Sequence, residues 1–177
     1  MHSNEKVSEI AKKIKLLILD VDGVLTDGGM YFNDKGTELK KFNSLDGHGI
    51  KMLIDSGIEV AVITARSTQS VSYRLEGLGV KNYYHGIADK SIALAELTEK
   101  LSINANESAY VGDDVIDLPA MTRVALPIAV ANAHSFVKEN SLFVTEKNGG
   151  EGAVREVCDM LLKAQDKYED LMRSYLK

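Results

Sequence analysis

The sequence predicts an α/β fold, in which a doubly wound, mainly parallel sheet of the Rossmann-like kind is covered by helices on both faces. Short apolar segments alternate with helical patterns along the whole chain, and this alternation is typical of parallel sheets. The length of 177 residues is that of about one domain. No internal repeat, low-complexity tract or Pro-rich linker divides the sequence. We therefore expect a single domain that spans residues 1–177.

The predicted elements follow this alternation. The strands are expected, in chain order, at residues 16–19, 60–63, 83–84, 109–111, 128–130 and 142–144. The helices are expected at residues 7–14, 47–56, 68–77, 89–101, 114–122, 134–139 and 152–175. The last of these carries an apolar stripe to Tyr175 and is expected to be one helix of about 24 residues and about 36 Å. Its end either packs on a partner or frays.

One segment interrupts the alternation after the first strand. Residues 30–42 read MYFNDKGTELKKF, in which the turn-forming NDKG lies between two extended stretches. This pattern predicts a β-hairpin that projects from the loop. Its apolar MYF triplet has no obvious core to enter, so the hairpin either contacts another subunit or folds back on its own domain.

Composition limits the class of partner and the compartment. The net charge of −5, with 45% hydrophobic and 27% charged residues, is typical of an ordinary globular protein and argues against nucleic acid or an anionic membrane as partner. The only cysteine, Cys158, lies in an apolar helical pattern, so no intrachain disulfide is expected. We expect neither a signal peptide nor a membrane span, and we expect a cytoplasmic protein.

The stretch LLILDVDGVL places two carboxylates at the end of an apolar strand. Side chains alternate along a strand, so Asp20 and Asp22 point to the same side, while Gly23 allows a sharp turn. The carboxyl ends of parallel strands are where ligands bind in open α/β sheets. Two carboxylates held this close repel each other, and either a cation or a shared proton relieves the repulsion.

A second acidic cluster follows another predicted strand. In YVGDDVIDLP, the residues after Gly112 include Asp113, Asp114 and Asp117. Hard oxygen ligands on neighbouring strands favour Mg²⁺ over Zn²⁺. We expect Asp20 and Asp113 to bind the metal directly, and Asp114 and Asp117 to support it. The alternative for Asp113 or Asp114 is that it caps the next helix.

Two further residues have chemistry that suits a phosphate. Thr64 follows the apolar strand in VITAR, where its hydroxyl and nearby backbone N–H groups can face the same sheet edge. Lys90 opens a predicted helix, where a cation is unfavourable for the helix dipole. Its ammonium can neutralise a phosphoryl group and the carboxylates. The alternatives are that Thr64 is a helix cap and Lys90 a solvated lysine.

These residues, in this order and spacing, resemble the four motifs of the haloacid dehalogenase superfamily of phosphohydrolases. The matching set is Asp20-x-Asp22-Gly23, Thr64, Lys90 and Gly112-Asp113-Asp114-x-x-Asp117. The resemblance implies that Asp20 attacks phosphorus to give a phospho-aspartate, while Asp22 protonates the leaving oxygen and then activates water. It also implies that Mg²⁺ is bound by Asp20, Asp113 and the backbone carbonyl of Asp22, and that Thr64 and Lys90 contact phosphoryl oxygens.

Within the superfamily, the chain resembles phosphatases of sugar-acid phosphates over nearly its full length. The supporting stretches are VDGVLTDG, FNSLDGHGI, VITARSTQSVSYRLEGLGV, YVGDDVIDLPAM, IAVANAH and GGEGAVREVCDMLL. Only 44 positions separate Asp20 from Thr64, and 26 separate Thr64 from Lys90, so no large cap domain fits between them. The resemblance implies a homotetramer in which the hairpin and the C-terminal segment of neighbouring subunits help to close each site.

The implied substrate is an eight-carbon 3-deoxy-octulosonate phosphate, used in lipopolysaccharide precursor synthesis. Its carboxylate calls for an arginine, so Arg66 and Arg74, both expected on the helix after Thr64, are candidate contacts, with surface salt bridges as the alternative. His48 is a candidate contact to sugar hydroxyls or a loop histidine without a role. The rival functions are a phosphatase for a nine-carbon sialic-acid-type 9-phosphate and a catalytically idle binding module.

Four positions depart from the relatives' pattern. The residues concerned are His48, Ala65, Asn132 and Glu151, where relatives carry Tyr, Gly, Asp and a basic residue. None of these departures removes a group assigned to catalysis. They bear on the contacts to the sugar instead.

Overall fold

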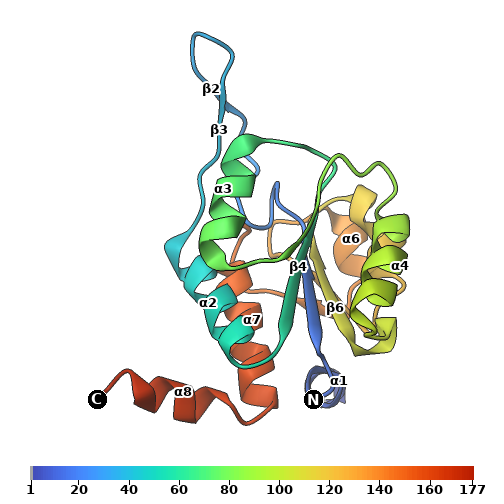
Figure 1. The fold of residues 1–177 in the computed structure, drawn as a ribbon. Coiled ribbons are helices and arrows are strands. Elements are labelled where there is room, and N and C mark those ends of the chain that lie inside the picture. The colour runs from blue at the N-terminus through green and yellow to red at the C-terminus, as the bar shows by residue number, and fades with distance from the viewer. Residues whose placement is uncertain (1) are drawn as a thin grey trace.

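The computed structural model describes residues 2–177, and a six-stranded parallel sheet forms its centre (Figure 1). The strands lie in the order β5-β4-β1-β6-β7-β8. Their bounds are β1 Leu16–Leu19, β4 Glu59–Ile63, β5 Asn82–Tyr84, β6 Ser108–Gly112, β7 Leu126–Ala129 and β8 Phe143–Val144. Each pair of neighbours is parallel. The predicted fold class is therefore confirmed, and all six strands form within about two residues of the expected positions.

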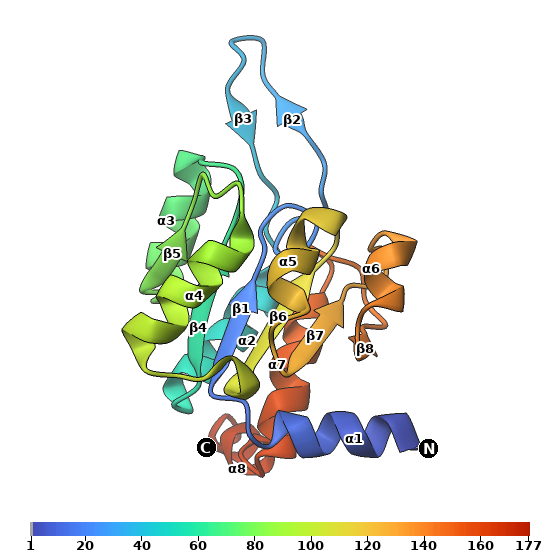
Figure 2. The same ribbon diagram turned by 90° about the vertical axis from the view of Figure 1, so that its right-hand side faces the viewer.

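Helices cover both faces of this sheet. Their bounds are α1 His2–Ala11, α2 Ser44–Asp55, α3 Gln69–Leu78, α4 Lys90–Leu101, α5 Leu118–Met121, α6 Ser135–Glu139, α7 Ala153–Ala164 and α8 Tyr168–Ser174, with 3₁₀ turns η1 Ala105–Glu107 and η2 Val115–Asp117. Helices α2, α3 and α7 lie on one face, whereas α4, α5 and α6 lie on the other (Figures 1 and 2). Helix α1 crosses below the amino ends of the strands (Figure 2).

Strand β1 is the best-buried element of the sheet. All four of its residues are buried, because β4 and β6 pair with its edges and helices cover its two faces. Such burial explains why LLIL is apolar without alternation. The chain leaves β1 through Asp20, whose backbone N–H still donates to the carbonyl of Val111 in β6 (3.1 Å). The rigid central strand therefore fixes the backbone that carries the first acidic pair.

The predicted hairpin is present and projects beyond the carboxyl ends of the strands (Figure 2). Its strands are β2 Tyr31–Phe32 and β3 Glu38–Leu39, paired antiparallel, and an isolated antiparallel bridge joins Thr26 to Phe42 at its base. Met30, Tyr31, Phe32 and Leu39 are all exposed. The hairpin therefore does not fold back to bury its apolar side chains on this chain.

The expectation of one C-terminal helix over residues 152–175 is wrong. Helix α7 ends at Ala164 and α8 begins at Tyr168, because Asp166 adopts a left-handed backbone with φ of 56°. The side-chain amide of Gln165 donates to the carbonyls of Ala11 and Ile14, which holds the turn against α1. The apolar stripe thus bends to follow the domain. Among the described residues, no helix is long and apolar enough to cross a membrane.

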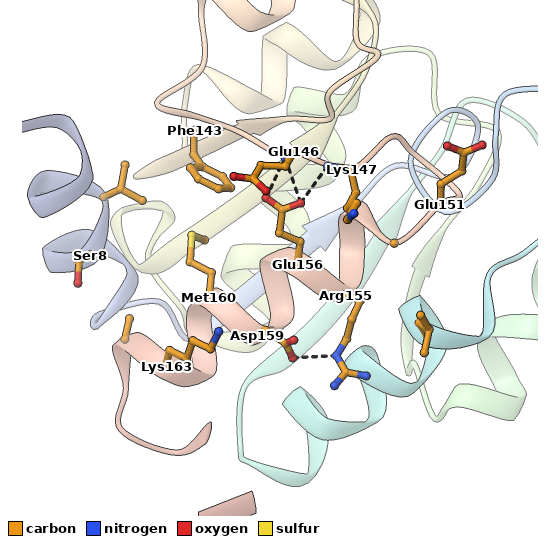
Figure 3. A pocket seen from close by; sticks show the side chains of 14 residues that line it. Ser8, Phe143, Glu146, Lys147, Glu151, Arg155, Glu156, Asp159, Met160 and Lys163 are labelled. Atoms are coloured by element: carbon orange, nitrogen blue, oxygen red, sulfur yellow. Dashed lines mark hydrogen bonds and ion pairs between the residues drawn. The ribbon is translucent and has the colours of Figure 1, made fainter. Parts of the chain in front are cut away.

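A pocket of about 760 Å³ lies between α1, β8 and α7 (Figure 3). Its lining mixes charges that already have partners. Glu156 accepts from the backbone N–H groups of Glu146 and Lys147, and the Arg155 guanidinium pairs with Asp159 at 2.8 Å. None of the candidate site residues predicted from the sequence lines this pocket.

Close backbone packing holds the loop after β1 in place. A Cβ atom at Gly149 would overlap the carbonyl of Gly23, and Asn132 Oδ1 accepts the Gly149 N–H at 2.9 Å. Asn132 therefore has a structural contact, although it departs from the relatives' residue. Because Gly23 directly follows Asp22, the position of Asp22 depends on this contact.

Gly149→Ala should lower the free energy of unfolding by about 1–3 kcal/mol, because the added methyl group meets backbone that cannot turn away. Gly77→Ala is the matched control. Gly77 lies in α3 with nothing within 4 Å of an added Cβ, so this variant should gain about 0.5–1 kcal/mol. Denaturant unfolding of both variants measures the difference. Equal stability of the two would contradict the packing argument.

Candidate active site

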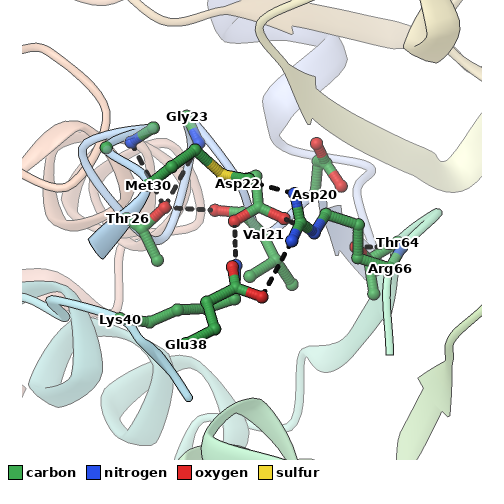
Figure 4. Close-up of polar contacts among 12 residues, drawn as sticks. Asp20, Val21, Asp22, Gly23, Thr26, Met30, Glu38, Lys40, Thr64 and Arg66 are labelled. Carbon is green, nitrogen blue, oxygen red and sulfur yellow. Dashed lines mark hydrogen bonds and ion pairs between the residues drawn. The ribbon is translucent and has the colours of Figure 1, made fainter. Parts of the chain in front are cut away.

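The first acidic pair lies where β1 ends, and its two carboxylates face different surroundings. Asp20 is buried, as is Val21 beside it, so the backbone between the two acids is held by the core. Asp22 is partly exposed, and its Oδ1 pairs with the ammonium of Lys40 (Figure 4). The carboxylate of Asp20 is therefore enclosed by the protein, whereas that of Asp22 is partly open to solvent.

A buried lysine joins Asp20 to the second acidic cluster. Lys90 is the first residue of α4, and its Nζ lies 2.7 Å from Asp20 Oδ1 and 2.6 Å from Asp117 Oδ1. Burial disfavours the charged ammonium, but the two carboxylates together raise the pKa of Lys90. The alternative of a solvated lysine is therefore wrong, and Lys90 is a fixed positive charge between two acids.

Asp117 is held by more contacts than its neighbours and orients the groups around it. It is fully buried, and its Oδ1 also accepts from the Tyr110 hydroxyl at 3.0 Å. Its Oδ2 accepts the backbone N–H of Asp113 at 3.1 Å. With both oxygens engaged, Asp117 fixes Lys90 and the turn after β6. This arrangement fits the supporting role predicted from the sequence.

Asp20, Asp113 and Asp117 form a cluster in which one carboxylate oxygen of each lies within 4.8 Å of the others. Asp113 fits there because Gly23 has no side chain, and a Cβ at Gly23 would overlap the Asp113 carboxylate. Burial, and after it the charge of Asp117, raises the pKa of Asp20 to about 7. Burial and the charge of Asp20 raise the pKa of Asp113 to about 7. The single positive charge of Lys90 therefore does not balance the three carboxylates.

Asp114 lies beside this cluster but is exposed, and it caps a turn. Its Oδ1 accepts the backbone N–H of Val115 at 2.7 Å, and Asp117 accepts the N–H of Asp114, which completes a capping box for η2. The capping alternative therefore describes Asp114. Asp113, whose side chain makes no such contact, remains available to a metal.

Thr64 is buried at the end of β4, on the same edge of the sheet. Its Oγ1 accepts the backbone N–H of Arg66 at 3.3 Å. The helix that follows begins only at Gln69, with Thr68 as its N-cap residue, so Thr64 does not cap it and Arg66 precedes it. The expectation that Arg66 lies on this helix is wrong, because a loop of several residues separates β4 from α3.

Arg74 and His48 are held by contacts within the chain. The Arg74 guanidinium donates to the carbonyl of Asn43 at 3.1 Å and lies over the Phe42 ring, which ties α3 to the end of the hairpin. His48 lies on α2, not in a loop, and its ring contacts that of Tyr175 at 5.5 Å. The structure therefore brings neither side chain to the acidic cluster in these contacts.

Two residues at this edge were not predicted from the sequence. Lys40 and Glu38 lie on the same side of the hairpin strand, and the Lys40 ammonium is 3.0 Å from Glu38 Oε1. Glu38 Oε2 in turn accepts from the Arg66 guanidinium at 2.8 Å (Figure 4). Glu38 and Lys40 are two positions apart in GTELKKF, and side chains two positions apart on an extended segment lie on the same face. This spacing is the sequence signal that could have predicted their ion pair.

The arrangement suits the transfer of a phosphoryl group. An enclosed carboxylate, Asp20, can act as a nucleophile, and the more open Asp22 can move a proton. Lys90 and the Thr64 hydroxyl supply donors beside them, and the acidic cluster supplies hard oxygen ligands for a divalent cation.

Comparisons with known proteins also indicate a phosphatase of the haloacid dehalogenase type. A family model described as haloacid dehalogenase-like hydrolase matches residues 84–157. The chain is 51% identical over 160 residues to the 3-deoxy-D-manno-octulosonate 8-phosphate phosphatase KdsC of Escherichia coli K12. The aligned residues cover 90% of this chain and 85% of that protein.

Solved structures agree with this relationship. One of them is the phosphatase of the same name from Moraxella catarrhalis in complex with magnesium ion, phosphate ion and KDO molecule. It matches this chain with a TM-score of 0.94 and 42% sequence identity, and the match covers 97% of this chain and 98% of that one. The cobalt-bound enzyme of Haemophilus influenzae has a TM-score of 0.90 and 40% identity over 95% and 99% of the two chains. The chain therefore belongs to the 3-deoxy-D-manno-octulosonate 8-phosphate phosphatase family of the haloacid dehalogenase superfamily.

Proposed function

We propose that the protein is a Mg²⁺-dependent phosphatase that hydrolyses 3-deoxy-D-manno-octulosonate 8-phosphate to the free sugar acid and inorganic phosphate, in the supply of lipopolysaccharide precursors. The observation that carries the proposal is the buried Asp20–Lys90–Asp117 group beside Asp22 and Asp113, in a member of this family. The neighbour that contains magnesium, phosphate and KDO supports the same ligands here.

The residues at the strand ends fit a Mg²⁺ ion. Asp20 and Asp113 offer carboxylate oxygens close together, and burial together with the neighbouring carboxylates raises the pKa of each to about 7. We assign the metal to Asp20, Asp113 and the backbone carbonyl of Asp22, with Asp117 holding Asp113 in place. When bound, Mg²⁺ neutralises excess carboxylate charge and polarises a phosphoryl oxygen.

The two carboxylates after β1 divide the chemistry. An Asp20 oxygen attacks phosphorus, so a bond from Asp20 to phosphorus forms as the bond to the sugar oxygen breaks, and Asp22 gives its proton to that oxygen. Water then attacks phosphorus, its proton passes to Asp22, and the bond to Asp20 breaks to release phosphate. The contact with Lys90 holds Asp20 in place, and Lys90 and Thr64 stabilise charge on the phosphoryl oxygens.

Arg66 is the candidate contact for the substrate's carboxylate. Its guanidinium is partly exposed at the mouth of the site, and its Nε lies 4.0 Å from Asp22 Oδ2. Arg74 and His48 contact the substrate in this proposal only where a neighbouring subunit presents them, since both have partners within the chain. The nine-carbon sugar-acid 9-phosphate is the competing substrate, and an idle binding module is the competing class of function.

Assembly is part of the proposal. We infer a homotetramer in which the exposed apolar side chains of the hairpin meet other subunits near their active sites. A cytoplasmic location completes it, because the free, buried thiol of Cys158 suits a reducing compartment.

A phosphate-release assay tests the activity and the substrate together. With Mg²⁺, the protein should release phosphate from 3-deoxy-D-manno-octulosonate 8-phosphate faster than from nine-carbon sugar-acid 9-phosphates, and a chelator should abolish release. Asp20→Asn should lower kcat by at least about a thousandfold, because the nucleophile is lost. Asp55→Asn, at the exposed C-terminal end of α2, is the control and should retain activity.

The outcomes separate the alternatives. Preference for the nine-carbon ester would retain the mechanism and overturn the substrate. No release from any ester, with Asp20→Asn equal to the parent, would favour an idle binding module.

Mg²⁺ should raise the thermal midpoint more at about pH 8 than at about pH 6. Because the pKa of Asp20 and of Asp113 is raised to about 7, the folded metal-free protein holds protons that the unfolded chain loses above about pH 4. Its stability therefore falls as the pH rises toward about 7. Protons compete with Mg²⁺ below that pH and weaken its binding by roughly tenfold per pH unit for each group.

Thermal unfolding with and without Mg²⁺ at the two pH values measures this. Asp113→Asn should remove most of the Mg²⁺ response, whereas Asp114→Asn should retain it, because Asp114 caps η2. An equal response at both pH values would argue against the buried carboxylates as ligands.

Phe32→Ser should dissociate the tetramer, because it removes an exposed aromatic side chain from the hairpin. Ile92→Ser on α4 is the matched control, since Ile92 is 59% exposed and Phe32 is 58% exposed. Light scattering should report a tetramer for the parent and the Ile92 variant and a smaller species for the Phe32 variant. A parent protein that is monomeric and fully active would refute shared sites.

A further inference from the structure

Lys40 is a buried lysine at the base of an otherwise exposed hairpin. Its side chain is 1% exposed, whereas that of the next residue, Lys41, is 61% exposed. Leu39, which precedes it, is exposed as well. Enclosing an ammonium costs free energy unless opposite charges surround it. The contacts of Lys40 should therefore explain why the chain places it there.

Lys40 is one of four charged side chains that form a ring of alternating positive and negative charge, and Asp22 is another member of this ring (Figure 4). Its Nζ contacts Asp22 Oδ1 and, at 3.0 Å, Glu38 Oε1. Glu38 contacts the Arg66 guanidinium at 2.8 Å, and Arg66 approaches the other oxygen of Asp22 at 4.0 Å. Each charge thus has opposite charges on both sides, which restricts the rotation of every side chain in the group.

We propose that Lys40 is a positioning residue that holds the Asp22 carboxylate in its orientation for proton transfer. This inference rests on the proposed function, in which Asp22 moves the protons. Asp22 is only partly buried, and among the hydrogen bonds of the described residues its carboxylate accepts from the Lys40 ammonium and not from a backbone N–H group. Its orientation therefore depends on side chains, and Lys40 makes a closer ionic contact with it than Arg66 does.

The identity of the leaving group distinguishes this role from simple anchoring of the hairpin. A sugar alkoxide needs the proton of Asp22 as it departs, whereas p-nitrophenolate is stable enough to leave without one. A misplaced Asp22 should therefore slow the first step for the sugar ester but not for p-nitrophenyl phosphate. The second step, in which Asp22 takes a proton from water, should become slow for both substrates.

The test is Lys40→Met in the full chain, with Lys41→Met as the control. Lys40→Met should lower kcat for the sugar ester by about a hundredfold with little change in KM. With p-nitrophenyl phosphate it should show a burst of p-nitrophenolate about equal to the enzyme concentration, because the phospho-aspartate accumulates. Lys41→Met should match the parent in both assays. In an Asp22→Asn background, Lys40→Met should cause no further loss.

Anchoring alone predicts a different result. It would lower the thermal midpoint but leave kcat per folded molecule unchanged, and it would give no burst. The losses of activity caused by Lys40→Met and Asp22→Asn would then multiply in the double variant. These results would overturn the inference. If Lys40→Met does not fold, Glu38→Gln, which removes the second ionic partner of Lys40, carries the test. It should slow the first step, formation of the phospho-aspartate, for the sugar ester and leave that step unchanged for the aryl ester. Equal slowing of the first step for both esters would overturn the inference. A parent protein without any phosphatase activity would instead refute the proposed function.

Discussion

The Lys90 ammonium, held inside the protein between Asp20 and Asp117, is the interaction on which the rest of the site depends. It joins the first turn of α4 to the end of β1 and to the turn after β6, so three separate segments meet at one charge. One ammonium does not balance Asp20, Asp113 and Asp117. Burial, and after it this remaining negative charge, raises the pKa values of Asp20 and Asp113, and the same charge favours the divalent cation that we propose.

The hairpin extends this electrostatic organisation to the mouth of the site. Strand alternation places Glu38 and Lys40 on the side that faces Asp22 and leaves Leu39 exposed on the other. One short element thus presents charges to the active site and an apolar surface to solvent. In our proposals, this short element serves both proton transfer and subunit assembly.

The sequence was sufficient for features that depend on local pattern. The apolar runs predicted the six strands, and the acids after β1 and β6 converge because parallel strands end at one edge. It was insufficient where tertiary contacts decide. The left-handed Asp166 broke a continuous apolar stripe because Gln165 binds α1, and Lys40 was overlooked because a lysine in a hairpin is ordinarily solvated. The contact of Arg74 with the Asn43 carbonyl could not be predicted from the sequence either, because it joins segments that are distant along the chain.

In our proposal, Arg66 connects the catalytic group to the choice of substrate. The Arg66 guanidinium pairs with Glu38, so an entering anion has to share Arg66 with Glu38 or replace Glu38. Arg66 has five N–H donors in a planar fork, so it can bind Glu38 and a second carboxylate at once. A ligand with a carboxylate adds a partner without removing one, whereas a neutral sugar phosphate adds none. Selectivity for sugar acids can therefore arise while Glu38 stays in place and Lys40 keeps its contact with Asp22.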